Sequence, residues 1–131
     1  MNITVFLVFY IAQIFLSFPT FWSTCERLNF ERFAIYFAHH ALDIFLFWSP
    51  FFLITRREHI AHLIALIAVS IHWITNNNNC ITTEYMNRLC GYKKDQWLDS
   101  LKNMFDFRKY TEYFLFIWLG ILGIGDIYYI L

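Results

Sequence analysis

Four apolar stretches of this 131-residue chain are each long enough to cross the hydrocarbon core of a membrane. A transmembrane helix needs about 20 predominantly apolar residues, with a range of about 17–25. The stretches are Ile3–Trp22, Phe33–Leu53, Glu58–Thr75 and Tyr113–Leu131. The chain is 59% hydrophobic and 15% charged, whereas a soluble domain is about 45–50% apolar and about 25% charged. A soluble fold of this size could not bury that excess, and we therefore expect an all-α integral membrane protein that forms a four-helix bundle.

The segment between the third and fourth stretches, residues 76–111, has a different character. Thr82 or Thr83 can cap a short helix that stops at Gly91. Asp95–Phe107 then shows the pattern of an amphipathic helix, which lies in the membrane interface or docks on the end of the bundle. We expect residues 1–131 to form a single transmembrane domain with this polar, helical cap between its third and fourth helices.

Local signals predict where the first two helices begin and end. Pro19 marks the end of the first, because a helix usually stops or kinks near proline. Ser23–Glu26 fits a capping box, which predicts a second helix that runs from there through Leu53. Ser49-Pro50 lies inside that helix, where we expect a kink.

The link between the second and third stretches predicts an antiparallel hairpin. Thr55–Glu58 is too short for any other connection, and the hairpin places His40 and His72 at the same depth. Polar residues that are far apart in the chain then converge on one side of the membrane. Ionisable residues at membrane depth are costly and indicate a functional site by default. The converging residues are His39, His40, Asp43, His72, Asn76, Asn77, Cys80, Glu84 and Cys90.

Several kinds of site fit these residues. Asp43 shares a helix face with His39 and His40, and a carboxylate there can fix the tautomer of a histidine. One interpretation is a metal site with His40, His72 and Cys80 as ligands, and another is a haem held by the two histidines. A third is a proton relay or a channel. The fourth, which we favour, is a structural cluster in which these groups and the run of asparagines at 76–79 hydrogen-bond one another and the backbone.

The three cysteines allow two interpretations. Cys80 and Cys90 could form a disulfide on the non-cytosolic side, or remain free thiols on the cytosolic side. The count of Lys and Arg favours the side that holds the cap as cytoplasmic, and hence free thiols. For Cys25 we expect packing or, at most, palmitoylation.

The opposite membrane side carries one acidic residue in the fourth stretch. Asp126 lies at the depth of His62, and a buried carboxylate without a partner is costly. Its candidate partners are His62, His59 and Arg57. Gly120 and Gly123 precede it, and small residues let transmembrane helices approach closely, so we expect this flank to pack on the first or third helix.

A family resemblance accompanies these motifs. His40, an apolar span, Arg56-Arg57, His62, a second span and Cys80-x-x-Thr83-x-x-x-Asn87 resemble a family of small bacterial membrane proteins with a Cys-Pro-Leu-Thr motif after the corresponding hairpin. The string from His39-His40 through His72-Trp73-x-x-Asn76-Asn77-Asn78-x-Cys80 to Cys90-Gly91 is similar to small polytopic membrane proteins of giant DNA viruses. The resemblance covers roughly residues 39–108 and implies a topology, without an established activity. The chain departs from the bacterial pattern at Ile81, where proline is usual, and at Met86, where an acid is usual.

The expected function is that of a structural or assembly component of a viral, host or organellar membrane. Its partners would be the lipid bilayer and other membrane subunits or further copies of the chain. The net charge is zero, and the absence of a basic stripe or phosphate loop argues against nucleic acid. The sequence indicates no particular reaction, and we expect a role other than catalysis. The alternatives are a metal- or haem-binding redox protein and a small oligomeric proton or ion channel lined by His40 and Asp43.

Overall fold

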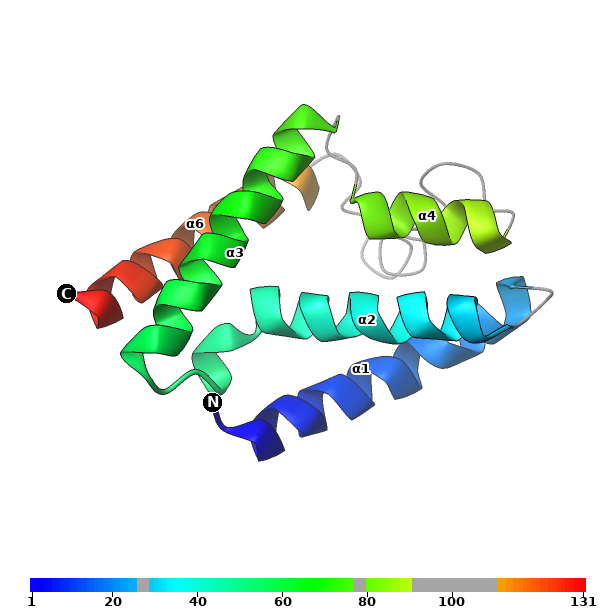
Figure 1. The fold of residues 1–131 in the computed structure, drawn as a ribbon, viewed down its shortest axis with the longest axis horizontal. Helices are drawn as coiled ribbons and strands as arrows, with labels where there is room; N and C mark the ends of the chain where they lie inside the picture. The colour runs from blue at the N-terminus through cyan, green and yellow to red at the C-terminus, as the bar shows by residue number, and fades with distance from the viewer. Residues whose placement is uncertain (26–28, 77–79, 91–110) are drawn as a thin grey trace.

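The computed structural model describes residues 1–25, 29–76, 80–90 and 111–131. These residues are almost entirely helical (Figure 1), and they contain no strand, which confirms the all-α class. In chain order the elements are α1 (Ile3–Thr24), α2 (Phe30–Phe47), the 3-10 turn η1 (Ser49–Phe51), α3 (Arg56–Thr75), α4 (Ile81–Cys90) and α6 (Thr111–Ile130).

The helices associate in two groups. α1 and α4 both lie against α2, whereas α3 packs mainly against α6 (Figure 1). The last turn of α2 joins the groups, because Phe45 packs on His62, Leu46 on Leu66 and Phe47 on Trp73. The predicted close hairpin of the second and third helices is therefore wrong. α3 runs obliquely past the end of α2 and does not lie along its length.

The boundary between α1 and α2 differs from the prediction. α1 continues through Pro19 to Thr24, so that proline does not end the first helix. The predicted helix start at Ser23 is also wrong, because α2 begins after Asn29. The Asn29 side chain accepts a hydrogen bond from the Arg32 backbone N–H at 2.9 Å, and asparagine is among the best N-cap residues.

The second apolar stretch is not one continuous α-helix. α2 spans 18 residues and ends at Phe47, and Pro50 lies in the short 3-10 turn that follows. Proline has no backbone N–H and its ring clashes inside a helix, so a break replaces the expected kink. α3 then starts with a capping box that we did not predict. The Thr55 side chain accepts from the Glu58 N–H at 3.4 Å, and Glu58 accepts from the Thr55 N–H at 3.0 Å.

The described part of the cap is a single helix. α4 starts at Ile81, one residue before the first of the two threonines predicted to cap it, and ends at Cys90. The second predicted cap helix, 95–107, and Gly91 lie outside the described residues.

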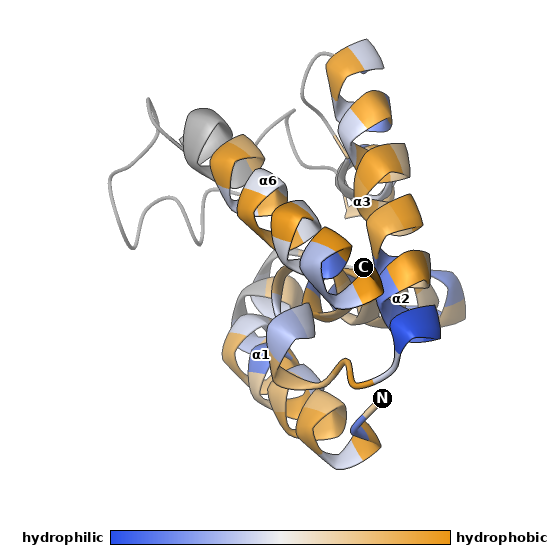
Figure 2. Ribbon diagram, turned by 90° about the vertical axis from the view of Figure 1, so that its left-hand side faces the viewer, coloured by the Kyte–Doolittle hydropathy of each residue, from blue (hydrophilic) through white to orange (hydrophobic). Residues whose placement is uncertain are grey.

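Two helices are long and apolar enough to span a membrane, against the four that were predicted. They are α1 over Ile3–Ser23 and α3 over Arg56–Thr75, and α6 adds a shorter apolar segment, Phe116–Ile130. Figure 2 shows hydrophobic residues along α3 and α6, with hydrophilic residues gathered at the N-terminal end of α3. Among the described residues, two candidate spans indicate association with a membrane but do not establish four crossings.

Candidate functional site

The first polar cluster lies between α1 and α2. Gln13 Nε2 is 2.8 Å from His40 Nδ1 and 3.4 Å from an oxygen of Asp43. An amide NH₂ group only donates, so His40 accepts at Nδ1 and carries its hydrogen on Nε2. That Nε2 lies 2.9 Å from Ser17 Oγ, which is also 2.5 Å from the Tyr36 hydroxyl. Both ring nitrogens of His40 are therefore occupied by side chains of α1.

Two histidines hold the start of α4. His39 Nδ1 lies 3.4 Å from the Thr82 hydroxyl, and Cys80 Sγ lies 2.9 Å from the same hydroxyl. His72 Nε2 accepts from the backbone N–H of Ile81 at 3.2 Å. The first N–H groups of a helix have no partner within it, so His72 of α3 satisfies one of them. The predicted convergence of these groups is thus found around α4, with His39 rather than His40 on the α2 side.

The alternative metal site of His40, His72 and Cys80 is not assembled. His40 points to α1, His72 is bonded to the α4 backbone, and Cys80 contacts Thr82. Within the described ranges, no three His, Cys, Asp or Glu side chains gather so as to hold a metal ion. Both ring nitrogens of His40 are bonded to α1 side chains, so neither is available to bind a haem iron.

The remaining described members of the predicted cluster, Asp43, Asn76 and Glu84, each make different contacts. Asp43 lies 3.5 Å from His39, which is longer than the bond of about 3.2 Å that we expected. The backbone N–H of Asn76 closes α3 on the carbonyls of His72 at 2.9 Å and Trp73 at 3.2 Å. The Glu84 N–H bonds to the Cys80 carbonyl at 3.0 Å in the first turn of α4. Asn77 and the two asparagines after it lie outside the described residues.

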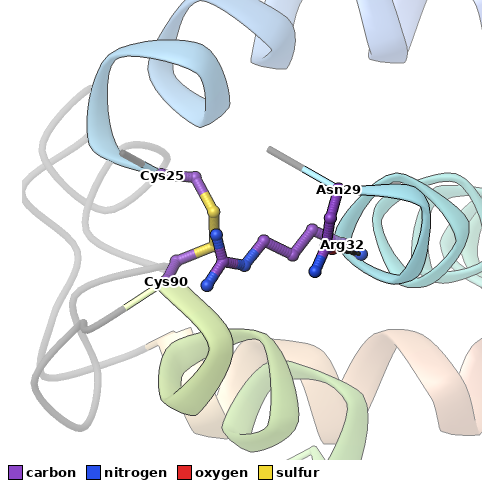
Figure 3. Close-up of a disulfide and its surroundings, with 4 residues drawn as sticks. All are labelled: Cys25, Asn29, Arg32 and Cys90. Carbon is purple, nitrogen blue, oxygen red and sulfur yellow. Dashed lines mark hydrogen bonds between the residues drawn. A yellow bond between two sulfur atoms is a disulfide. The ribbon is translucent and has the colours of Figure 1, made fainter. Parts of the chain in front are cut away.

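A disulfide joins Cys25 to Cys90 across 65 positions (Figure 3). This corrects both cysteine predictions, since Cys80 is the free thiol and Cys25 is bridged. The bridge forms because α4 lies against α2, so that Cys90, the last residue of α4, reaches the end of α1. Figure 3 shows the Arg32 side chain extending from the first turn of α2 toward the sulfurs.

A further contact secures the middle of α4. The Tyr85 hydroxyl donates a hydrogen bond to Glu31 in the first turn of α2. This bond to a carboxylate raises the pKa of the Tyr85 hydroxyl above its ordinary value, because the bond is lost when the hydroxyl ionises. Together with the disulfide and the two histidines, it attaches α4 to its neighbours at both ends and at its centre.

The second polar cluster lies between α3 and α6. The two carboxyl oxygens of Asp126 form hydrogen bonds with His59 Nδ1 at 2.7 Å and with His62 Nδ1 at 2.5 Å. His62 Nε2 lies 3.2 Å from the Leu46 carbonyl of α2. The exposed fractions are 5% for His59, 0% for His62 and 3% for Asp126. Two of the three candidate partners of Asp126 thus bind it simultaneously, whereas the contribution of the Leu46 carbonyl has no signal in the sequence.

Only one of the two predicted packing glycines makes a helix contact. A Cβ atom added to Gly123 would lie 3.7 Å from Leu63 of α3. One added to Gly120 would have no neighbour within 4 Å. The prediction for Gly120 is therefore wrong as far as the described residues are concerned, because this position faces away from α3.

No protein-family model, curated protein or solved structure matches this chain. The resemblance to small membrane proteins of giant DNA viruses consequently stays a prediction.

A cavity of about 200 Å³ adjoins the second cluster. His59 and Asp126 line it together with mostly apolar and aromatic side chains. Its lining consists of Ser49, Pro50, His59, Trp118, Ile121, Leu122, Gly125, Asp126 and Tyr129.

Proposed function

We propose that this chain is a multi-pass integral membrane protein that serves as a structural or assembly component of a viral or organellar membrane. The observation that carries the proposal is a pair of exposed isoleucine rows, one on each helix of the α3–α6 pair. The row on α3 is 39–67% exposed and consists of Ile60, Ile64, Ile67, Ile71 and Ile74. The row on α6 is 47–71% exposed and consists of Ile117, Ile121, Ile124 and Ile127.

Residues three and four apart lie on the same face of a helix, so each row is continuous along its helix. Monomeric soluble proteins rarely expose apolar patches larger than a few hundred Å². Lipid acyl chains can cover such rows without loss of hydrogen bonds, since the backbone of an α-helix bonds internally. The length and composition of α1 and α3 support the same environment.

The positions of the polar groups support a structural role. His40, His62 and Asp126 are nearly inaccessible and are bonded to groups on a neighbouring helix. Such bonds attach helices to one another in lipid, where the hydrophobic effect does not drive helices together. In this proposal the clusters hold the helices together, and the isoleucine rows meet lipid or other membrane subunits.

The disulfide suggests an orientation for the inserted protein. Disulfides persist in oxidising compartments and are rare where thiols are kept reduced. The end of α1 and the end of α4, which carry Cys25 and Cys90, would then face the non-cytosolic side. Arg56 and Arg57 would face the cytosol. This orientation is opposite to the one that the Lys and Arg count predicts.

Alkaline carbonate extraction of membranes tests insertion. The full chain should stay in the membrane pellet and dissolve only with detergent. Ile67→Lys should reduce the inserted fraction, because a lysine near the centre of a spanning helix costs about 2.5–3.5 kcal/mol. Ile74→Lys is the matched control, since a lysine in the last turn can extend to the interface. Release of the unmodified chain as a soluble monomer without detergent would contradict the proposal.

Chemical cross-linking in the same membranes tests the assembly role. Species larger than one chain should appear with an amine-reactive cross-linker and should persist when the protein is diluted in lipid. A chain that remains a lone monomer in lipid nanodiscs, with no membrane subunit co-purifying, would contradict the assembly role while leaving insertion intact.

A further inference from the structure

The cluster of His59, His62 and Asp126 contains more hydrogen bonds than two neutral histidines and an ionised carboxylate have hydrogens to form. A backbone carbonyl only accepts, so the contact between His62 Nε2 and the Leu46 carbonyl requires a hydrogen on Nε2. The two contacts to Asp126, at 2.7 and 2.5 Å, each require one more hydrogen. Three hydrogens are therefore needed for the three contacts.

Two neutral histidines and a carboxylate provide only two hydrogens, because each neutral imidazole carries one and an ionised carboxylate carries none. Without a third hydrogen, one nitrogen and one oxygen would face each other through their lone pairs at hydrogen-bond distance. With it, the cluster has no net charge, whether the hydrogen is assigned to an imidazolium or to a carboxylic acid. Buried net charge is strongly unfavourable, so both arguments point to the same protonation state.

We propose that His59, His62 and Asp126 form a proton-binding site that holds one exchangeable proton between α3 and α6. The bound proton is shared in the contact of 2.5 Å between His62 and Asp126. The site differs from the structural role proposed above, and it does not depend on membrane insertion, because all three residues are held by packing within the chain.

The cavity beside the cluster provides the route for exchange. His59 uses Nδ1 for Asp126 and stacks on Tyr129, with ring centroids 4.5 Å apart. The His59 side chain makes no other hydrogen bond within the part of the chain that the structure describes, and the residue lines the cavity. His59 can thus accept a proton from the cavity at Nε2 and release one to Asp126 at Nδ1.

The surrounding elements add few other ionisable groups. α6 contributes Tyr129, and α2 with η1 contributes the Leu46 carbonyl and Ser49, which do not ionise in the ordinary range. On α3, Glu58 precedes His59 but accepts from the backbone N–H groups of Ile54 and Thr55 and from the Met1 amino group. In the described ranges, the cavity lining holds no ionisable side chains besides His59, Asp126 and Tyr129.

The proton count on unfolding tests this site. Full-length protein in detergent micelles is unfolded at pH 8 in weakly buffered solution, and the released protons are measured with an indicator dye. At this pH an unfolded carboxyl and most unfolded imidazoles hold no extra proton. The native chain should therefore release about one proton more than the Asp126→Asn variant, whose amide can donate to His62 without binding a proton. His72→Gln is the matched control and should release as many protons as the native chain.

A second measurement on the unmodified chain keeps the proposal testable if Asp126→Asn does not fold. Nitrogen NMR of the histidine rings at pH 8 should show hydrogens on both nitrogens of His62, or else infrared spectroscopy should show a protonated carboxyl group. His72 should lack a hydrogen on Nε2, since that atom accepts from Ile81. Equal proton release by the native chain and a folded Asp126→Asn variant overturns the proposal. So does a cluster whose three groups carry only two hydrogens.

Discussion

The Asp126 carboxyl group illustrates how one residue can join three helices. It bonds to two histidines of α3, and one of these bonds to the Leu46 carbonyl of α2. A buried polar group without a partner costs roughly 1–3 kcal/mol. Removal of any member therefore costs more than its own bond, because the others lose their partner while they remain buried.

We accordingly expect Asp126→Ala to lower the free energy of unfolding by about 2–4 kcal/mol, since two bonds involving charged or partly charged groups are lost. Denaturant unfolding in detergent micelles, monitored by circular dichroism, measures this change. Glu31→Ala is the control, because Glu31 is exposed and should change stability by less than about 1 kcal/mol. Equal effects of the two substitutions would show that the buried cluster contributes no more to stability than an exposed carboxylate does.

Tyr36 provides a second test at the residue scale. Its side chain is fully buried, and its hydroxyl lies 2.5 Å from Ser17 Oγ and donates to the Ile14 carbonyl at 3.1 Å. Tyr36→Phe should destabilise the chain by about 1–2 kcal/mol, because Ser17 loses a buried partner. Tyr85→Phe removes a hydroxyl from an exposed tyrosine and should have a smaller effect in the same unfolding measurement. The reverse order would contradict the arrangement of α1 and α2.

At the scale of helices, close approach decides which faces meet. α6 brings Gly123 against Leu63 of α3, but Gly120, one turn earlier, has open space. Small residues matter in helix packing only where a neighbour occupies the space that a side chain would need. The two positions should therefore differ in how well they tolerate a larger side chain, although both are glycines and lie one turn apart.

This difference gives a matched pair of substitutions. Gly123→Leu should destabilise the chain by about 1–3 kcal/mol, because the atoms beyond its Cβ meet Leu63 and separate α3 from α6. Gly120→Leu should stay within about 0.5 kcal/mol of the native stability. Unfolding of both variants under one condition provides the comparison. A larger loss at Gly120 would mean that this face has a neighbour beyond the described residues or in a second copy.

The attachment of α4 depends on a covalent bond between distant segments. Alkylation of unreduced, unfolded protein should modify one cysteine, Cys80, and alkylation after reduction should modify three. Cys90→Ser should lower the free energy of unfolding by about 4 kcal/mol, from the entropy of a closed loop of 65 positions. Cys80→Ser should leave the disulfide in place. Mass spectrometry of the alkylated protein gives the count, and three modified cysteines without reduction would contradict the bridge.

At the scale of the whole molecule, the disulfide and the isoleucine rows together predict an orientation in the membrane. In a Cys80→Ser background, Arg57→Cys should react with a membrane-impermeant maleimide only from the cytosolic face. Phe30→Cys, which replaces an 88% exposed side chain at the first residue of α2, should react only from the opposite face. Labelling of sealed vesicles of known sidedness measures this. The reversed pattern would instead support the orientation favoured by the Lys and Arg count.

The sequence by itself determined the helical class and the apolar stretches, and it limited the partners of Asp126 to three candidates, of which the structure selects His59 and His62. These depend on local composition, on residue spacing and on the high cost of an unpaired buried carboxylate. It also located the polar residues that gather near the start of α4. It wrongly included His40 in this group, because the His40 side chain bonds to side chains of α1. Local signals were less reliable at helix ends. Asn29 caps α2 in place of the predicted Ser23, and the capping box at Thr55–Glu58 was not predicted.

Only the tertiary structure decided which helices pack together. Pro50 ends the helical geometry of α2 and redirects the chain, so α3 leaves α2 and pairs with α6 instead of folding back along it. That change of direction opens the space in which α4 lies, and it brings Cys90 to Cys25 instead of leaving it with Cys80. The direction of a break and the pairing of distant cysteines depend on contacts across the whole chain. Spacing along the sequence contains no information about them.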